Sequence, residues 1–281
     1  MSKIALITDS SCDLTQEIIK KYNIKVAPLR IIYKDKEYID RVNIQPKEVY
    51  DRLSQEIPTT SMPSMQDIDD LFTAAEDEGC THVIAITISS GLSGTFNTFK
   101  LVSDQHHNLT TFVFDSKTLS AGLGAVVAKC GELIAYGKSF EEIVNLLPSI
   151  KERVLVYYVV ETLEYLKKGG RIGRVAGTIG DLLKLKPIIS VDDDGKYFTY
   201  AKVRGRKQSI SKLADIAKDV LAAGKAEVYI LQGGAMEEGQ LLYEAFVGRE
   251  NISAIHFTDI SPALGVHTGP GLLGIIMLKE G

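Results

Sequence analysis

The sequence predicts an α/β protein, with an N-terminal α/β domain built on a parallel sheet and a C-terminal α+β domain built on a mixed sheet. In the first half, continuous apolar runs alternate with helical patterns, which is typical of strands buried on both faces of a parallel sheet. In the second half, two strand-like runs flank Asp192-Asp193-Asp194-Gly195-Lys196, which has the composition of a hairpin turn. The length of 281 residues agrees with about two domains. We place the boundary near residue 160, which gives domains 1–160 and 161–281.

Four apolar runs in the first half are predicted strands. They are Ile4–Thr8, Val83–Ile88, Thr111–Phe114 and Val154–Val160. A helical pattern follows each of the first three runs, as it does in a parallel sheet with helical crossovers. A further helix begins after Ser139, which forms a capping box with Glu142.

Residues from about 28 to 58 interrupt this alternation. Leu29–Tyr33 and Glu37–Ile39 flank a polar turn, which predicts a hairpin inserted over the surface of the domain. The residues from Pro58 onward have the composition of a loop. That loop ends at Ser64, where the S-x-x-D pattern predicts the start of a helix.

The second half has the pattern of an antiparallel hairpin followed by mixed strands and helices. Its predicted strands are Lys186–Val191, Tyr197–Val203, Ala226–Leu231, Ile252–Thr258 and Leu272–Leu278. Its predicted helices are Ser209–Ala222 and Met236–Val247. This order indicates helices packed on one face of a mixed sheet.

Composition and charge exclude several classes of protein. Lys and Arg total 32 and Asp and Glu total 36, so the net charge of −4 lacks the basic excess of nucleic-acid-binding proteins. No apolar run reaches about 18 residues, which predicts no transmembrane span, and the N-terminus lacks the apolar region of a signal peptide. Cys12, Cys80 and Cys130 are too few and too widely spaced for a disulfide framework or a zinc site. We therefore expect a soluble cytoplasmic protein without a bound metal.

Two polar loops, Thr8–Ser11 and Thr87–Thr95, follow predicted strands. In an open parallel sheet the loops after the carboxyl ends of the strands meet at a crevice where ligands bind. Hydroxyls and glycines before a helix can donate to an anion, and the same residue types are the usual N-caps, so both interpretations stay open. Neither loop contains G-x-x-x-x-G-K-[ST] or G-x-G-x-x-G, the usual nucleotide-binding signatures.

One of these loops comes close to the nucleophile elbow of serine hydrolases. Gly91-Leu92-Ser93-Gly94-Thr95 differs from G-x-S-x-G only at its fifth position. Ser93, Asp259 and His267 follow the chain order Ser…Asp…His, so a serine hydrolase using Ser93 and His267 is the alternative hypothesis. His267 lies in a stretch rich in glycine and proline, which predicts a shaped loop. A surface histidine near a turn is the competing interpretation.

Two basic clusters occur in this acidic chain, at residues 164–174 and 202–207. Lysines and glycines at the end of a helix have capping roles, but Arg171 and Arg174 exceed what capping requires. If the two clusters form one positively charged face, that face would bind an anionic group or an acidic partner protein. The alternative interpretation is that these basic side chains are simply exposed to solvent and bind no partner.

Taken together, these motifs resemble the DegV family of bacterial fatty-acid-binding proteins. The resemblance rests on five segments that occur in order over nearly the whole chain: Thr8–Leu14, Thr60–Ser64, Ser89–Thr95, Leu163–Ile172 and His267–Gly271. Met62 is a departure, because the family often has glutamine at this position.

The resemblance implies a two-domain α/β protein that holds one long-chain fatty acid, such as palmitate, stearate or oleate, between its domains. It implies that the carboxylate is bound by the hydroxyl of Thr60 or Ser61 together with Ser93 and the adjacent Gly94. It also implies that His267 lies close by.

The resemblance further implies a partner, a fatty acid kinase that phosphorylates the bound acid to an acyl phosphate. In such a pair this protein is a non-catalytic acyl carrier with no cofactor and no ATP site of its own. Arg171 and Arg204 match basic positions that lie, in the family, near the carboxyl end of the ligand and on the kinase-facing surface.

Overall fold

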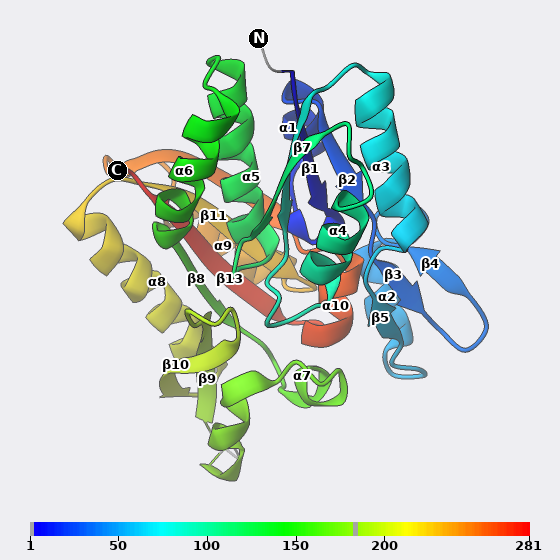
Figure 1. Cartoon of the computed structure of the whole chain (residues 1–281). Coiled ribbons are helices and arrows are strands. Elements are labelled where there is room, and N and C mark those ends of the chain that lie inside the picture. The colour runs from blue at the N-terminus through cyan, green and yellow to red at the C-terminus, as the bar shows by residue number, and fades with distance from the viewer. Residues whose placement is uncertain (1–2, 182–184) are drawn as a thin grey trace.

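The computed structural model describes residues 3–181 and 185–281. The described strands form a four-stranded parallel sheet, a six-stranded mixed sheet and a small three-stranded antiparallel sheet (Figure 1). The predicted fold class is therefore confirmed. Within the described residues, no helix is long and apolar enough to cross a membrane.

The four-stranded sheet has the strand order β2-β1-β6-β7. Its strands are β1 (Ile4–Asp9), β2 (Ile24–Ala27), β6 (His82–Thr87) and β7 (Thr110–Asp115). The helices of this half are α1 (Gln16–Lys21), α3 (Met65–Asp77), α4 (Thr95–Ser103), α5 (Ser120–Ala135) and α6 (Phe140–Glu152). The capping boxes predicted at Ser64 and Ser139 are both present. Apolar residues of α3 and α4 pack on one face of the sheet, and those of α5 and α6 pack on the other.

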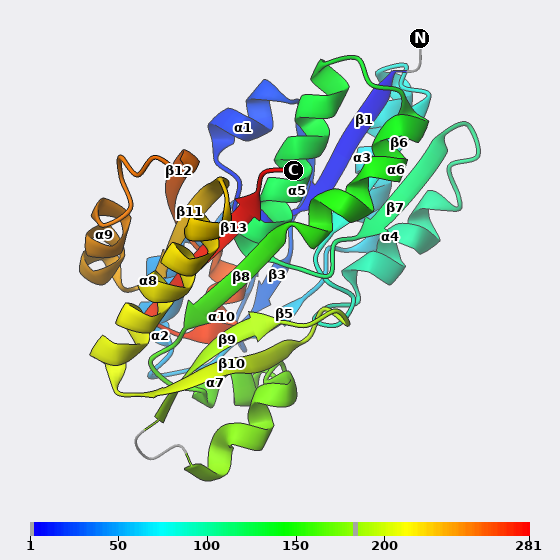
Figure 2. The same ribbon diagram turned by 90° about the vertical axis from the view of Figure 1, so that its left-hand side faces the viewer.

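The six-stranded sheet has the order β10-β9-β8-β13-β11-β12, and its pairs are antiparallel except for β11 with β12. Its strands are β8 (Val154–Val159), β9 (Leu185–Val191), β10 (Tyr197–Arg204), β11 (Ala226–Gly233), β12 (Ile252–Asp259) and β13 (Leu272–Lys279). Helices α8 (Arg206–Ala223) and α9 (Met236–Glu244) cover its outer face (Figure 2). Strand β8 pairs with β9 and β13 of this sheet, although it precedes the domain boundary that we placed near residue 160. The position of that domain boundary stays a prediction.

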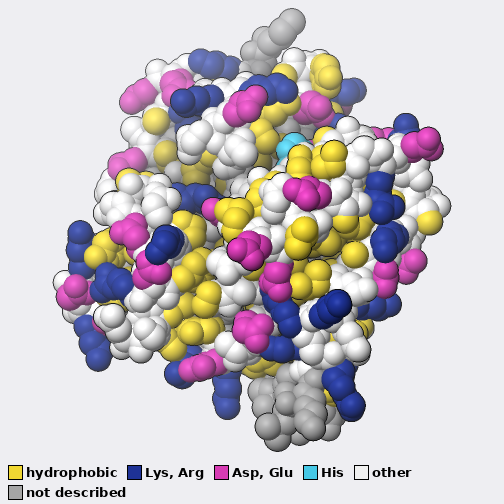
Figure 3. Space-filling model, turned by 180° about the vertical axis from the view of Figure 1, so that it is seen from behind, with side chains coloured by type: hydrophobic (Ala, Val, Ile, Leu, Met, Phe, Trp, Pro, Cys, Tyr) yellow, Lys and Arg dark blue, Asp and Glu magenta, His cyan; other side chains and the backbone are white. Residues whose placement is uncertain are grey.

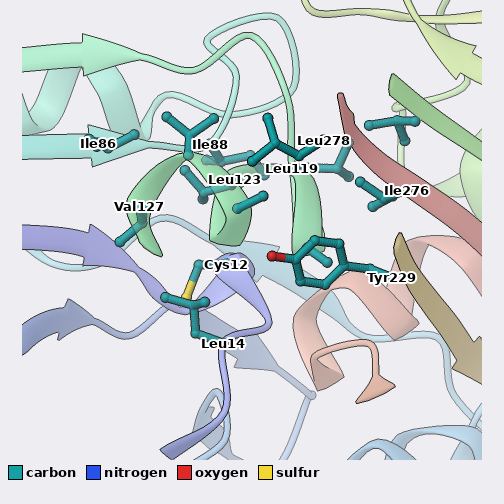
Figure 4. Packing of buried hydrophobic residues seen from close by; sticks show 14 of the residues in the cluster. Cys12, Leu14, Ile86, Ile88, Leu119, Leu123, Val127, Tyr229, Ile276 and Leu278 are labelled. Atoms are coloured by element: carbon teal, nitrogen blue, oxygen red, sulfur yellow. The ribbon is translucent and has the colours of Figure 1, made fainter. Parts of the chain in front are cut away.

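Helix α5 lies between the two large sheets and contacts both. Its first half is rich in small residues, and Gly122 and Gly124 are fully buried. A side chain at Gly124 would overlap the carbonyl oxygen of Cys12, so glycine is required for this close approach. Figure 4 shows the resulting core, in which side chains of α5 pack with Ile86 of one sheet and Ile276 of the other.

The inserted segment forms β3 (Arg30–Ile32) and β4 (Glu37–Ile39), so the predicted hairpin is confirmed. The expectation of a loop from Pro58 onward is wrong at β5 (Thr59–Ser61), because these residues pair with the free edge of β3. Helix α2 (Pro46–Arg52) of the same segment packs against α10 (Pro262–Thr268) near the C-terminus. The insertion therefore joins the N-terminal part of the chain to the C-terminal part.

The surface agrees with the modest net charge. Figure 3 shows acidic and basic side chains interspersed over the face opposite to the view in Figure 1, with apolar groups between them. Cys12, Cys80 and Cys130 are free and buried, as expected for cysteines that act as small core residues.

Candidate ligand-binding site

A polar pocket forms where the inserted segment, the loop after β6 and helix α10 meet. Thr60 and Ser61 reach it from β5, Ser93 from the β6–α4 loop, and His267 from α10. Its complete lining is Leu29, Thr60, Ser61, Met62, Ile88, Leu92, Ser93, Arg171, Tyr197, Ala263, Leu264 and His267. Gly94 follows Ser93 at the start of α4, and a side chain on Gly94 would meet the sulfur of Met62.

His267 lies in a helix, so the expectation of a loop at this position is wrong. Ser261 caps α10 by accepting a hydrogen bond from the Leu264 amide, and Pro262 occupies the first turn. The helix ends at Gly269, which has a φ of 67°. The glycine and proline residues of this stretch are therefore the start and stop signals of a short helix.

The imidazole of His267 is held in a neutral state. Its Nε2 lies 2.6 Å from Oγ1 of Thr60. Burial, with a smaller contribution from the nearby Arg171 guanidinium, lowers the pKa of His267 to about 4. The other ring nitrogen, Nδ1, has no hydrogen-bond partner and lies so close to Gly169 that a side chain there would overlap it.

The Ser93 loop is anchored from both large sheets. Asp9, at the end of β1, accepts a hydrogen bond of 2.7 Å from the Ile88 amide. On the other side, Oγ of Ser89 donates to the carbonyl oxygen of Gly195, in the β9–β10 turn, at 2.8 Å. The hydroxyl of Ser93 lies 2.8 Å from that of Thr95.

The two arginines singled out in the sequence occupy different environments. Arg171 follows α7 (Glu164–Lys168) and lines the polar pocket. Its Nη1 donates to the carbonyl oxygen of Gly169 at 2.7 Å, and its Nε donates to that of Leu92 at 3.3 Å. Arg204 lies at the end of β10, is exposed, and does not line the pocket.

An apolar chamber adjoins the polar pocket, and Tyr197 and Leu264 line both. It lies between α5 and the inner face of the six-stranded sheet, and its lining is Leu119, Ser120, Val156, Tyr157, Tyr158, Tyr197, Leu231, Ile260, Leu264, Thr268, Leu272, Gly274 and Ile276. A polar pocket next to an apolar chamber suits a ligand with a polar head and a long apolar tail. The chamber residues could not be predicted from the sequence, because there they have only the pattern of ordinary buried positions.

A buried polar network next to the polar pocket was also not predicted from the sequence. The carboxylate of Asp40 accepts hydrogen bonds from Oγ of Ser10 at 2.6 Å and from the Ala263 amide of α10 at 2.9 Å. Next to it, Arg41 donates to Asp13 at 2.7 Å and to the carbonyl oxygen of Asp259 at 2.8 Å. Burial raises the pKa of Asp40 to about 7. This network ties the inserted segment to the start of the helix that carries His267.

The arrangement does not support the serine hydrolase hypothesis. A triad needs the histidine to hydrogen-bond both the serine and the acid. Here Nε2 of His267 faces Thr60, the Ser93 hydroxyl faces Thr95, and the Asp259 carboxylate accepts from the side-chain amide of Gln232. Across residues 3–181 and 185–281, no group of three or more His, Cys, Asp or Glu side chains is placed to hold a metal ion.

Fold and cavities together define an α/β protein in which a polar pocket adjoins an apolar chamber. The chain belongs to the DegV family: the family model described as "Uncharacterised protein, DegV family" matches residues 3–280. A DegV domain-containing protein of Clostridium acetobutylicum is 52% identical over 280 residues, with 100% of each chain covered. One from Clostridium perfringens is 50% identical over 280 residues, again with 100% of each covered.

Three solved structures share the whole fold. A fatty-acid-binding DegV protein of Thermus thermophilus superimposes with a TM-score of 0.93 at 28% identity, covering 99% of this chain and 100% of that one. One from Streptococcus agalactiae, also described as fatty-acid-binding, has a TM-score of 0.91 at 31% identity, with 100% of each chain covered. A stearic-acid-binding protein of Eubacterium ventriosum has a TM-score of 0.85 at 27% identity, covering 99% of this chain and 98% of that one.

Proposed function

We propose that this protein binds one long-chain fatty acid, with its carboxylate in the polar pocket and its tail in the apolar chamber. The observation that carries the proposal is that the polar pocket and the apolar chamber are neighbours, with Tyr197 and Leu264 lining both. A palmitate tail buries roughly 14 methylenes at about 0.8 kcal/mol each, which is about 11 kcal/mol before association costs of several kcal/mol. The fatty-acid-binding relatives support the same ligand class.

The head group would be bound mainly by hydroxyls. Thr60, Ser61 and Ser93 supply hydroxyl donors, and a desolvated carboxylate requires such hydrogen bonds. Arg171 adds positive charge, but two of its donors are already engaged by backbone carbonyl oxygens. The carboxylate is therefore not held in a complete arginine fork, and it keeps an oxygen able to act as a nucleophile.

We further propose that the bound acid is the substrate of a fatty acid kinase, for which this protein is the acyl carrier. In that reaction a carboxylate oxygen forms a bond to the terminal phosphorus of ATP held by the kinase, and ADP leaves. A neutral His267 beside Thr60 would orient the carboxylate for this attack. Arg204, exposed outside the pocket, would belong to the docking surface.

Native mass spectrometry of the purified protein, followed by organic extraction, tests the ligand. We expect one fatty acid per chain. A protein that yields no extractable lipid and does not bind added palmitate or oleate would contradict the proposal.

The kinase step is tested with His267→Ala. The variant should keep bound fatty acid and form less acyl phosphate with the kinase. The wild-type protein alone should hydrolyse p-nitrophenyl esters no faster than Ser93→Ala. Esterase activity that disappears in both Ser93→Ala and His267→Ala would restore the hydrolase hypothesis.

A further inference from the structure

The chamber is followed by a second cavity along the same face of the six-stranded sheet. In the β11–β13 register, Leu231 pairs with Gly274, Tyr229 with Ile276, and Glu227 with Leu278. Alternate residues of a strand face the same side and lie about 7 Å apart, so these pairs form successive steps along one face.

The two cavities divide at Tyr229. Leu231, Gly274 and Ile276 line the apolar chamber. Tyr229, Glu227 and Leu278 line the next cavity, a groove closed on its other side by α1 and α5. The chamber and the groove are therefore neighbours, and Tyr229 is the first groove residue beyond the chamber on β11.

The groove has a different chemistry from the chamber. Its charged lining residues include Lys21, Lys129, Glu132, Arg153, Lys279 and Glu280. Positively charged lysine and arginine side chains and negatively charged glutamate side chains therefore line the groove together. A hydrocarbon chain that entered such a polar groove would gain little by leaving water.

The ring of Tyr229 is fixed in place. It is 5% exposed and stacks on His256, with ring centroids 4.6 Å apart and an angle of 20° between the planes. Its hydroxyl donates to Oε1 of Glu227 at 2.7 Å, and that oxygen also lies 2.8 Å from Nε2 of His256. Figure 4 shows the ring projecting into the core cluster that contains Leu119 and Ile276.

We propose that Tyr229 is the end stop of the acyl chamber, a residue that sets the longest chain the protein accepts. This inference rests on the proposed fatty acid function. The chamber reaches Leu231, Gly274 and Ile276 on the β11–β13 face, and Tyr229, which pairs with Ile276, lines the groove beyond it. A tail extended along this face would therefore end against the Tyr229 ring. Removing the ring leaves space among the apolar side chains of the same cluster, such as Leu231, Ile276 and Leu278, for additional methylenes.

The test is the affinity of the full-length protein for saturated fatty acids of increasing chain length. In the wild type, affinity rises with length and then falls sharply. In Tyr229→Ala the optimum moves to longer chains, with a gain of roughly tenfold for every two further methylenes that fill the space of the removed ring; methylenes that would extend beyond it into the charged groove add little. An unchanged length profile in Tyr229→Ala overturns the proposal.

Two matched variants separate the ring from its hydrogen bonds and from the groove. Tyr229→Phe keeps the ring and loses the bond to Glu227, so its length limit should equal that of the wild type. Tyr22→Ala removes a ring from the opposite wall of the groove and should also leave the limit unchanged. A shift in either variant as large as that in Tyr229→Ala overturns the end-stop role.

Two further controls address a Tyr229→Ala variant that fails to fold and a wild-type protein that binds no fatty acid. If circular dichroism shows that Tyr229→Ala is unfolded, Tyr229→Leu takes its place, because it shortens the side chain and keeps apolar packing. Its optimum should also move to longer chains, and an unchanged limit overturns the proposal. A wild-type protein that binds no fatty acid of any length contradicts the proposed function instead, so the two failures are distinguishable.

Discussion

Thr60 and His267 are 207 positions apart in the chain, and their side chains meet at 2.6 Å in the polar pocket. Each is placed by a different element: Thr60 by its pairing with Ile31 in the small sheet, and His267 by the short helix α10. Because burial keeps the imidazole neutral at pH 7, the hydrogen bond to Thr60 involves no full charge. The hydroxyls of the pocket are therefore the groups whose loss should affect the ligand most directly.

We expect the double variant Thr60→Ala/Ser93→Ala to bind fatty acid more weakly than the wild type. Each lost hydrogen bond to a charged carboxylate should cost about 1.5–3 kcal/mol. Isothermal titration with oleate measures the difference. Thr59→Ala is the matched control, since Thr59 is an exposed neighbour on β5 that does not line the pocket. Equal affinities of the double variant and the wild type would reject the site.

Arg171 and Arg204 should differ in their effect on fatty acid affinity. Arg171→Ala should lower fatty acid affinity, because the guanidinium lines the pocket. Arg204→Ala should leave that affinity unchanged and should reduce acyl phosphate formation with the kinase, most strongly at low ionic strength, since salt screens exposed charges. Ligand loss in Arg204→Ala, or none in Arg171→Ala, would contradict these assignments.

At the scale of elements, α5 decides how closely the two large sheets approach. The helix contacts β1 and β6 on one side and β8 and β13 on the other. The beginning of α5 also supplies a wall of the apolar chamber, through Ser120 and the preceding Leu119. The beginning of α5 therefore contributes both to the core and to the wall of the apolar chamber.

Gly124→Ala tests this role of α5. Alanine normally stabilises a helix relative to glycine by about 0.5–1 kcal/mol. Here the added methyl group would overlap the carbonyl oxygen of Cys12, so we expect a net destabilisation of about 1–3 kcal/mol in urea unfolding. Gly224→Ala is the control, because a side chain at Gly224 meets no atom within 4 Å. A Gly124→Ala variant as stable as the wild type would show that α5 can move away from Cys12.

At the scale of the whole molecule, the inserted segment is the connection between the two ends of the chain. Asp40 and Arg41 bind Ser10 and Asp13, which follow β1, and also Asp259 at the end of β12 and Ala263 in α10. The apolar side chains of α2 and β3 pack with Ala263 and Val266 of the same helix. The position of His267 therefore depends on contacts with a segment more than 200 residues earlier, such as the Asp40–Ala263 bond, which spans 223 positions.

This network predicts a pH dependence of stability. The pKa of Asp40 is raised from 3.8 to about 7, so between about pH 4 and pH 7 the folded protein binds a proton that the unfolded chain releases. The Asp40 contribution to stability is therefore present at low pH and is lost as the pH rises to about 7. Asp40→Asn removes this contribution while the amide can still accept from Ala263 and donate to Ser10.

Urea unfolding of both proteins across this range measures the effect. We expect the stability of the wild type to fall relative to that of Asp40→Asn as the pH rises, and the difference to be constant above about pH 7. Other titrating groups, such as Asp9 and His267, are common to both proteins and largely cancel in the comparison. Parallel stability curves would contradict the raised pKa.

Local patterns in the sequence determined most of the secondary structure. The buried strands of the parallel sheet, the capping boxes at Ser64 and Ser139 and the hairpin around Asp192–Lys196 all follow from residue types within a few positions of one another. Motif resemblance also selected residues that the fold brings into one pocket, among them Thr60, Ser93 and His267. Short-range preferences are encoded locally, so a sequence without a structure reveals them.

Only the tertiary structure decided how these pieces combine. The apolar chamber draws on α5, β8, β11 and β13, and nothing in its members' sequence distinguishes them from other buried residues. The same holds for Asp40, whose role depends on Ala263, 223 positions away. Cavities, buried carboxylates and end stops arise from long-range packing, which depends on the whole chain rather than on any local pattern.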